Sequence, residues 1–288
     1  MAEIFEDPMA DITIDGRKVH YADRGAGPPI VLLHAGASSG KQWSRIASLL
    51  ESRFRLIAPD LWGMGETDAW PNRDLTHDDQ ADLVGSLLEI LGLASVHLVG
   101  HSYGASAATR FVLMHPSKVR TLTLVEPNTA HLLKLAGEVA LYSEYEEIAL
   151  TFIESAASGH PEVGWARFLN YRSGPDAWSE LSADARAKFL ATTGNIVTGF
   201  YSTLRNSTTL EDLRGIRHDT LVVCGGASLP LDRKVTEIVR DNLSRCTYRV
   251  VPGAGHFSPV THPQAVSELL EKHVTSVPDV TRSPRLST

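Results

Sequence analysis

The sequence predicts an α/β protein in which a mostly parallel central sheet is flanked by helices and carries a helical cap insertion. Short apolar runs alternate with longer segments of helical periodicity, a pattern typical of buried parallel strands covered on both faces. The alternation is interrupted once, at residues 128–218, where helix-like segments occur and no strand is expected. Because structureless loops of that length are rare, we interpret this segment as an inserted helical unit.

The predicted elements before the insertion follow from local patterns. Two short strands, 12–14 and 18–22, flank the turn dipeptide Asp15-Gly16 and form a hairpin. Thr76, with Asp79 three residues later, marks the start of a helix that Gly92 ends. The remaining strands are expected at 29–34, 54–58, 96–99 and 119–125, and the remaining helices at 43–50 and 103–114.

After the insertion the sheet pattern resumes. Strands are expected at 220–224 and 247–251, and helices at 232–242 and 263–273. The Pro-, Ser- and Arg-containing segment 276–288 is expected to be a disordered tail. We therefore divide the chain into a core domain, residues 1–127 and 219–275, and a cap, residues 128–218.

Composition limits the partners that we expect. The net charge is −7 and basic residues are spread singly, which argues against nucleic-acid binding. No window approaches the roughly 18 apolar residues of a membrane helix, and the acidic N-terminus lacks the features of a signal peptide. With two cysteines, a cytoplasmic location without a disulfide framework is the default. The expected partner is a small-molecule substrate, and a homodimer is left open.

A candidate nucleophile lies between a predicted strand and a predicted helix. Gly100-His101-Ser102-Tyr103-Gly104 fits the pattern G-x-S-x-G, and this context is the one that a nucleophile elbow requires. Glycines at both ends let strand and helix approach closely, while Ser102 occupies a strained turn at a helix N-terminus that favours negative charge. The alternative is an ordinary Gly-rich turn between strand and helix.

His256 is the best candidate for a general base among the twelve histidines. It follows a Gly-rich turn directly after the last predicted strand, so it emerges at the same sheet edge as Ser102. Imidazole titrates near neutral pH, so it can accept a serine proton and return it to a leaving group. The alternative is an ordinary surface-loop histidine.

The order of elements, the elbow, the His34-Ala35-Gly36 loop and the terminal Gly-His resemble the α/β-hydrolase superfamily over roughly residues 11–273. The resemblance implies an oxyanion hole formed by the backbone N–H groups of Tyr103 and Gly36. Ala35 replaces the glycine that is usual in this loop, and His34 is interpreted as a residue that braces it.

The acid of the triad departs from the usual pattern of this superfamily. Ser228 stands where the resemblance places an aspartate, and serine cannot carry the charge that stabilises an imidazolium. Glu126 ends the strand 119–125, where zearalenone lactone hydrolases and haloalkane dehalogenases carry their acid. Asp232 begins a helix, where a carboxylate is expected simply as a cap. We favour Glu126 over Asp232; a salt-bridging role at the strand end is its alternative reading.

The leading hypothesis is hydrolysis of a carboxylic ester or lactone of a small, largely apolar substrate, with no metal or organic cofactor. Aromatic candidates for substrate binding are Trp62, Trp165, Tyr171 and Trp178. Alternatives are hydrolysis of a carbon–carbon bond in a ring-cleavage product, cofactor-free perhydrolysis, or a non-catalytic binding protein of the same fold. Dehalogenase and epoxide hydrolase chemistry is disfavoured, because those relatives use Asp at the position of Ser102.

Overall fold

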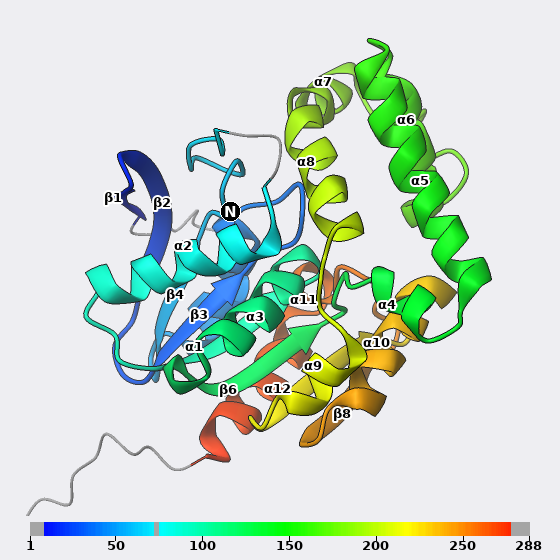
Figure 1. Cartoon of the computed structure of the whole chain (residues 1–288). Helices are drawn as coiled ribbons and strands as arrows, with labels where there is room; N and C mark the ends of the chain where they lie inside the picture. The colour runs from blue at the N-terminus through cyan, green and yellow to red at the C-terminus, as the bar shows by residue number, and fades with distance from the viewer. Residues whose placement is uncertain (1–8, 72–74, 278–288) are drawn as a thin grey trace, which may run out of the picture.

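The computed structural model describes residues 9–71 and 75–277, and their strands form one eight-stranded sheet (Figure 1). The strand order is β1-β2-β4-β3-β5-β6-β7-β8. The pairs β1–β2 and β2–β4 are antiparallel, whereas the six strands β3 to β8 run parallel to one another. The strands are β1 (Met9–Ile14), β2 (Arg17–Arg24), β3 (Pro29–Leu33), β4 (Arg55–Pro59), β5 (Val96–His101), β6 (Val119–Val125), β7 (Thr220–Gly225) and β8 (Cys246–Val251). The predicted fold class is confirmed.

Helices cover both faces of this sheet. They are α1 (Ser44–Leu50), α2 (His77–Ile90), α3 (Tyr103–Met114), α10 (Pro230–Asn242), α11 (Ser258–Thr261) and α12 (Pro263–Thr275). Alternate residues of β3 serve the two faces: Ile30 and Leu32 pack with α1 and α12, whereas Val31 and Leu33 pack with α2, α3 and α10. Burial on both faces explains why the parallel strands are nearly continuous apolar runs.

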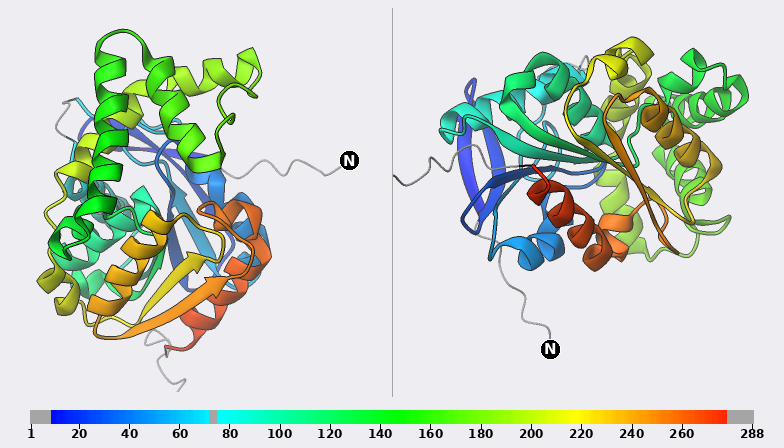
Figure 2. Two further views of the ribbon diagram at one scale, coloured as in Figure 1. Left: turned by 90° about the vertical axis from the view of Figure 1, so that its right-hand side faces the viewer. Right: turned by 90° about the horizontal axis from the view of Figure 1, so that it is seen from below.

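The insertion between β6 and β7 is helical throughout. Its helices are α4 (His131–Leu135), α5 (Val139–Ala157), α6 (Pro161–Ser173), α7 (Ala183–Ala191), α8 (Thr193–Leu204) and α9 (Leu210–Gly215). Helices α5 to α8 stand beyond the carboxyl ends of the strands (Figures 1 and 2). A cluster of aromatic rings, including Phe152, Trp165, Phe168 and Phe200, holds them together. From here on, the cap means helices α5–α8, which is a narrower range than the predicted insertion 128–218.

Several boundaries and caps follow from local chemistry. Thr76 and Asp79 form the expected capping box at the start of α2. Helix α10 begins at Pro230, two residues before the predicted start, because proline is well suited to the first helical position. Of the tail 276–288 that was expected to be disordered, Ser276 continues from α12 with its N–H on the His273 carbonyl at 3.2 Å, and residues 278–288 lie outside the described residues. Within the described ranges, no helix combines the length and apolar character needed to span a membrane.

The parallel register places the chemistry-bearing residues at one sheet edge. Val125 of β6 pairs with His101 of β5 on one side and with Val223 of β7 on the other. The residues that follow these strands therefore emerge together at the carboxyl ends, where open α/β sheets bind their ligands.

Candidate active site

Ser102 lies in a strained turn between β5 and α3. Its backbone has φ 54° and ψ −115°, a conformation that L-residues other than glycine rarely adopt. Its N–H donates to the Val125 carbonyl at 3.0 Å, and its own carbonyl accepts from the Asn128 N–H at 3.1 Å. The loop that follows β6 thus fixes the strained residue from both sides.

The two glycines of the motif are needed for close packing of the main chain. A β-carbon on Gly100 would lie 2.4 Å from the Gly104 carbonyl oxygen. One on Gly104 would lie 2.5 Å from the carbonyl oxygens of Leu33 and His34 at the end of β3. Any side chain at either position would push the elbow away from the sheet.

His256, in the turn between β8 and α11, joins Ser102 to a carboxylate. Its Nε2 lies 3.0 Å from Ser102 Oγ, and its Nδ1 lies 2.8 Å from Glu126 Oε2. Because an ionised carboxylate only accepts, Nδ1 carries the proton and Nε2 is left free to accept the serine proton. Ser102, His256 and Glu126 are the three residues that the sequence analysis predicts as the triad.

Glu126 is a buried carboxylate whose two oxygens have separate partners. Oε2 faces His256, while Oε1 accepts from the Gly225 N–H at 2.5 Å and from the Ser228 hydroxyl. Burial raises the pKa of Glu126, but hydrogen bonds from His256 and Ser228 and attraction to His256 outweigh burial and lower it. Ser228, at the usual position of the acid, is thus a hydrogen-bond donor to the acid.

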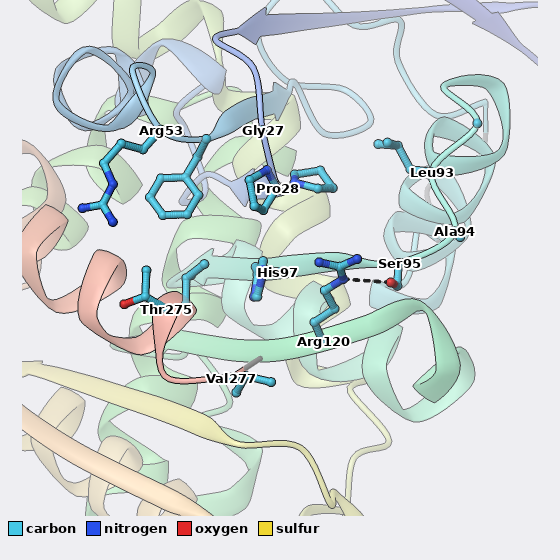
Figure 3. A pocket seen from close by; sticks show the side chains of 14 residues that line it. Gly27, Pro28, Arg53, Leu93, Ala94, Ser95, His97, Arg120, Thr275 and Val277 are labelled. Atoms are coloured by element: carbon cyan, nitrogen blue, oxygen red, sulfur yellow. Dashed lines mark hydrogen bonds between the residues drawn. The ribbon is translucent and has the colours of Figure 1, made fainter. Parts of the chain in front are cut away.

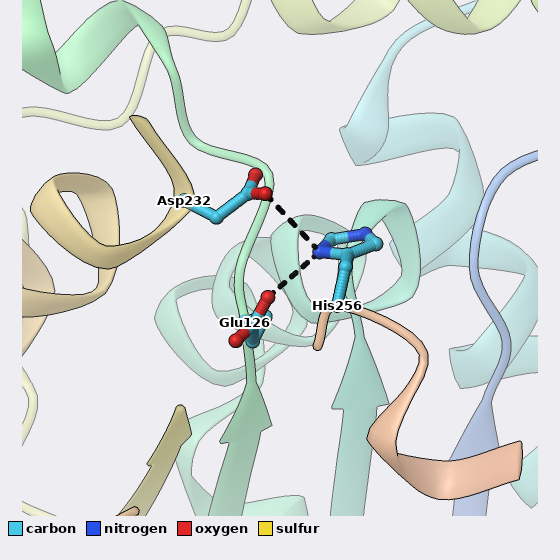
Figure 4. Close-up of side chains that lie close together, drawn as sticks. All are labelled: Glu126, Asp232 and His256. Atoms are coloured by element: carbon cyan, nitrogen blue, oxygen red, sulfur yellow. Dashed lines mark hydrogen bonds and ion pairs between the residues drawn. The ribbon is translucent and has the colours of Figure 1, made fainter. Parts of the chain in front are cut away.

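Asp232, the competing carboxylate, faces the same nitrogen of the imidazole, Nδ1, as Glu126 does (Figure 4). Its Oδ2 is 3.9 Å from His256 Nδ1, beyond hydrogen-bond distance, and 2.5 Å from Arg172 Nη1. Burial raises the pKa of Asp232, but attraction to Arg172 and His256, with the hydrogen bond from Arg172, outweighs burial and lowers it. Geometry therefore favours Glu126 as the acid, and the direct partner of Asp232 is an arginine of the cap.

Glu126, Asp232 and His256 also form the kind of cluster that could bind a metal ion, with ligand atoms within 4.8 Å of one another. Their donor atoms are already engaged: His256 Nδ1 with Glu126, and Asp232 with Arg172. A cation would have to displace the guanidinium, so the donor set fits proton transfer better than metal binding.

Gly36 and Tyr103, the expected oxyanion donors, face each other beside Ser102. Both line its cavity, and a β-carbon on Gly36 would lie 3.7 Å from Tyr103 Cβ. Among the described residues, neither backbone N–H has a hydrogen-bond partner, whereas the Ala35 N–H donates to Gln42 at 3.1 Å. The Tyr103 N–H, at the N-terminus of α3, and the Gly36 N–H, in the loop after β3, suit a developing oxyanion.

His34 braces this loop, as expected from the sequence. Its Nδ1 donates to the Ala35 carbonyl at 2.7 Å and its Nε2 accepts from the Leu61 N–H at 3.0 Å. Burial lowers the pKa of His34, so it stays neutral. The left-handed conformation of Ala37, with φ 57°, completes the turn.

Two side chains next to Ser102 have positions that the sequence did not reveal. His101 donates from Nε2 to the His256 carbonyl at 2.8 Å, and burial lowers its pKa to about 3. The Tyr103 hydroxyl lies 3.4 Å from both Gln80 Nε2 and Ser202 Oγ, so it links the elbow to helix α8. The only sequence signal for His101 and Tyr103 is that they flank Ser102 in the G-x-S-x-G motif.

A cavity of about 360 Å³ opens above Ser102, between the core and the cap. Its lining is mostly aromatic and aliphatic, with one cation, Arg172. The cap residues that line it include Tyr145, Trp165, Phe168, Leu169, Phe189, Ile196 and Phe200. This combination of an apolar cavity and a few convergent polar groups is typical of a small-molecule site.

Of the four aromatic residues proposed to bind substrate, the structure places only Trp165 in the lining of this cavity. Trp62 is buried against Trp70 and lines a separate pocket. Tyr171 stacks with Arg172, and Trp178 packs on Phe189; neither lines the cavity. Helical spacing alone could not tell which faces of α6 and α8 turn inward.

A wider cavity of about 930 Å³ lies at the other end of the sheet (Figure 3). It is lined by residues at the amino ends of β3 and β5, among them Pro28, Pro29 and Ser95, and by the end of α12. Despite its volume it lacks the nucleophile and the base. We therefore assign the chemistry to the smaller cavity above Ser102.

The sequence profile of the alpha/beta hydrolase fold family matches residues 28–263, which is most of the chain. The chain belongs to this family. Among curated relatives of this hydrolase, Epoxide hydrolase 2 from Siraitia grosvenorii is 40% identical over 114 residues, 38% of the chain and 36% of the relative. The chain thus matches little more than a third of the length of such relatives.

Other similarities extend along most of the chain. The 2-hydroxymuconate semialdehyde hydrolase of Pseudomonas sp. (strain CF600) is 24% identical over 272 residues, covering 90% of the chain and 91% of the relative. Among solved structures, an alpha/beta hydrolase enzyme from a Medee basin deep-sea metagenome has a TM-score of 0.76 at 19% identity, covering 95% of this chain and 100% of that one. A thermophilic esterase from Thermogutta terrifontis has a TM-score of 0.71 at 19% identity, with coverage of 93% and 98%. These structures show the shared fold.

Proposed function

We propose that this α/β hydrolase is a serine hydrolase that cleaves a carboxylic ester or lactone bond of a small, largely apolar substrate. The observation that carries the proposal is the hydrogen-bonded chain Ser102–His256–Glu126, with contacts of 3.0 and 2.8 Å. A nucleophile, a base and an acid that orients the base are the groups that acyl transfer by a serine triad uses.

In the proposed reaction Ser102 Oγ attacks the carbonyl carbon while its proton passes to His256 Nε2. The Glu126 carboxylate stabilises the imidazolium, and the N–H groups of Gly36 and Tyr103 bind the oxyanion. Collapse of the tetrahedral intermediate breaks the bond to the alcohol oxygen, which takes the proton from His256. Water then attacks the acyl-enzyme by the same route and releases the acid.

The hydroxyl at position 102 supports acyl transfer over the chemistry that some relatives' names indicate. Relatives named epoxide hydrolase and haloalkane dehalogenase match the chain over about two fifths of its length. The resemblance assigns those enzymes a carboxylate nucleophile, whereas this chain carries Ser102. An acyl-serine is hydrolysed by attack on a carbonyl, which the oxyanion donors serve.

The cavity supports the choice of an apolar substrate. Its volume of about 360 Å³ is at the small end of ligand pockets, and aromatic side chains from α5, α6, α7 and α8 form its roof. We expect p-nitrophenyl and naphthyl esters of medium-length or cyclic acids to be hydrolysed with higher kcat/KM than acetyl esters, because longer acyl groups bury more apolar surface.

A second candidate is hydrolysis of a carbon–carbon bond in a ring-cleavage product. This alternative is supported by the similarity to the 2-hydroxymuconate semialdehyde hydrolase, which matches almost the full length of the chain. The buried cation Arg172 beside the cavity is compatible with a substrate that bears an oxygen-rich acyl side.

One panel experiment separates these candidates. Purified enzyme and Ser102→Ala are assayed against aryl esters, lactones of several ring sizes and vinylogous diketones. The proposal expects turnover of esters or lactones by the parent protein only. Turnover confined to diketones would support the second candidate, and activity retained in Ser102→Ala would reject a serine nucleophile in both.

A further inference from the structure

Arg172 is a buried charge in an otherwise apolar setting. Its side chain, on cap helix α6, is 9% exposed and lines the cavity above Ser102. Its guanidinium lies over the ring of Phe168 and contacts Asp232 at 2.5 Å. Burying a guanidinium requires compensation, and Asp232, at the start of α10 in the core, supplies it.

The negative charge of Asp232, if it were not balanced, would weaken His256 as a base. Together with Glu126 it places two buried carboxylates around the single Nδ1 proton of His256, at 3.9 and 2.8 Å. Two uncompensated negative charges would stabilise the imidazolium, the form that cannot accept a proton from Ser102. Arg172 balances one of these charges without contacting Glu126.

We propose that Arg172 and Asp232 are positioning residues for the reaction: Arg172 holds and neutralises the Asp232 carboxylate, so that Glu126 alone orients His256 and His256 stays an effective base. The inference rests on the proposed function, since it assigns roles relative to that base. It also ties the base to the cap, because the ion pair joins α6 to α10. A cap that leaves the core takes the balancing charge with it.

The other groups around His256 do not supply this balance. His101, from the end of β5, stays neutral because burial lowers its pKa to about 3. Around the ion pair, burial raises the pKa of Tyr145 to about 12 and also raises that of Tyr171. The titratable or charged groups around the imidazole, named by the packed element they come from, are His101 at the end of β5, Ser102 after β5, Glu126 after β6, Asp232 on α10 and Arg172 on α6.

The test uses the pH dependence of inactivation by a fluorophosphonate, which needs no natural substrate. In that reaction Ser102 Oγ bonds to phosphorus, fluoride leaves, and the serine proton passes to His256. The second-order inactivation rate is measured from pH 4.5 to 9 for the parent enzyme, Arg172→Met, Asp232→Asn and the double variant. The midpoint of the acidic limb reports protonation of the base.

Opposite shifts are expected from the two single variants. In Arg172→Met the unbalanced carboxylate moves the midpoint up by about one pH unit, so the rate below the midpoint falls about tenfold. In Asp232→Asn the unbalanced guanidinium moves it down by a similar amount. The double variant returns to within about 0.3 units of the parent, because both charges are gone.

Matched variants separate charge from packing. Arg172→Lys keeps the charge and should keep the parent midpoint. Arg167→Met removes a charge from the same helix, where Arg167 pairs with exposed Glu147, and should leave the midpoint unchanged. A merely structural pair would change rates at every pH or lower the melting temperature without moving the midpoint. If Arg172→Met does not fold, the downward shift of Asp232→Asn decides.

The outcomes also distinguish this inference from the proposed function. Unmoved midpoints in both single variants, with the parent enzyme labelled at Ser102, would overturn the role of the ion pair and leave the triad intact. A parent enzyme that is not labelled at any pH would overturn the proposed function itself.

Discussion

Glu126→Gln removes one charge while keeping nearly the same shape, and the structure predicts a large loss of turnover. Oε1 of the parent side chain accepts from the Gly225 N–H and the Ser228 hydroxyl, and Oε2 accepts from His256 Nδ1. A glutamine has one acceptor oxygen and one NH₂ donor for these places. If the oxygen keeps Gly225 and Ser228, the NH₂ group faces Nδ1.

An NH₂ group facing Nδ1 forces the wrong tautomer on His256, with the proton on Nε2, where it cannot accept from Ser102. The opposite orientation sets two donors, the NH₂ group and the Gly225 N–H, against each other. Loss of the correct tautomer and of imidazolium stabilisation in such triads costs about 10³–10⁴-fold in kcat, or roughly 4–5.5 kcal/mol of barrier. The variant should remain folded, because its oxygen keeps both other hydrogen bonds.

The assay is kcat for an activated ester, with Asp232→Asn as the matched carboxylate control and circular dichroism as the check on folding. We expect Glu126→Gln to lose activity by the stated factor and Asp232→Asn to lose far less at pH above 8. An active Glu126→Gln enzyme beside an inactive Asp232→Asn enzyme would refute the reasoning and assign the acid to Asp232.

Three further predictions concern the surroundings of the site. Ser228→Ala removes one hydrogen-bond donor to the Glu126 carboxylate and should lower kcat by about tenfold or less. The kcat of the purified variant tests this, and a loss as large as that of Glu126→Gln would contradict the supporting role of Ser228. Gly104→Ala should prevent folding or lower the melting temperature strongly, because its β-carbon would clash with the main chain at the end of β3. The control Gly194→Ala, with nothing within 4 Å of its β-carbon, should be neutral or slightly stabilising. Equal melting temperatures of the two variants would contradict the packing argument. Burial lowers the pKa of His77 to about 3, below its unfolded value, so this residue stabilises the fold above pH 6.5 and loses that contribution as the pH falls toward 3. Between pH 7.5 and 5 the loss is about 2 kcal/mol, which urea unfolding of His77→Asn should show as a correspondingly flatter pH dependence; an unchanged slope would contradict it.

The sequence predicted the fold and the triad candidates for a definite physical reason. Strands read as apolar runs because they are buried on both faces, and parallel strands bring whatever follows them to one edge. That rule placed Ser102 and His256 at one edge, and the resemblance to the α/β-hydrolase superfamily added Glu126 as the candidate acid. Because Ser228 occupies the position where the superfamily usually carries its acid, the end of the neighbouring strand became the candidate position for that acid.

What the sequence could not predict depends on how the cap docks. The pair between Arg172 and Asp232 joins residues 60 positions apart on two helices, and no local pattern encodes their contact. The same reason explains why Tyr171 and Trp178, in the insertion, were proposed for the cavity yet lie elsewhere, whereas Trp62, in the loop after β4, is buried against Trp70. Which aromatic side chains turn inward is decided by packing between α5, α6 and α8, where several faces are apolar.

The most direct measurement is the site of covalent labelling by a fluorophosphonate, determined by peptide mass spectrometry of the intact enzyme and of His256→Ala. The account predicts one adduct per chain, located on residue 102 in the parent protein and formed at least a hundredfold more slowly without the imidazole. An adduct on another residue, or equal labelling rates in the two proteins, would contradict a serine activated by His256.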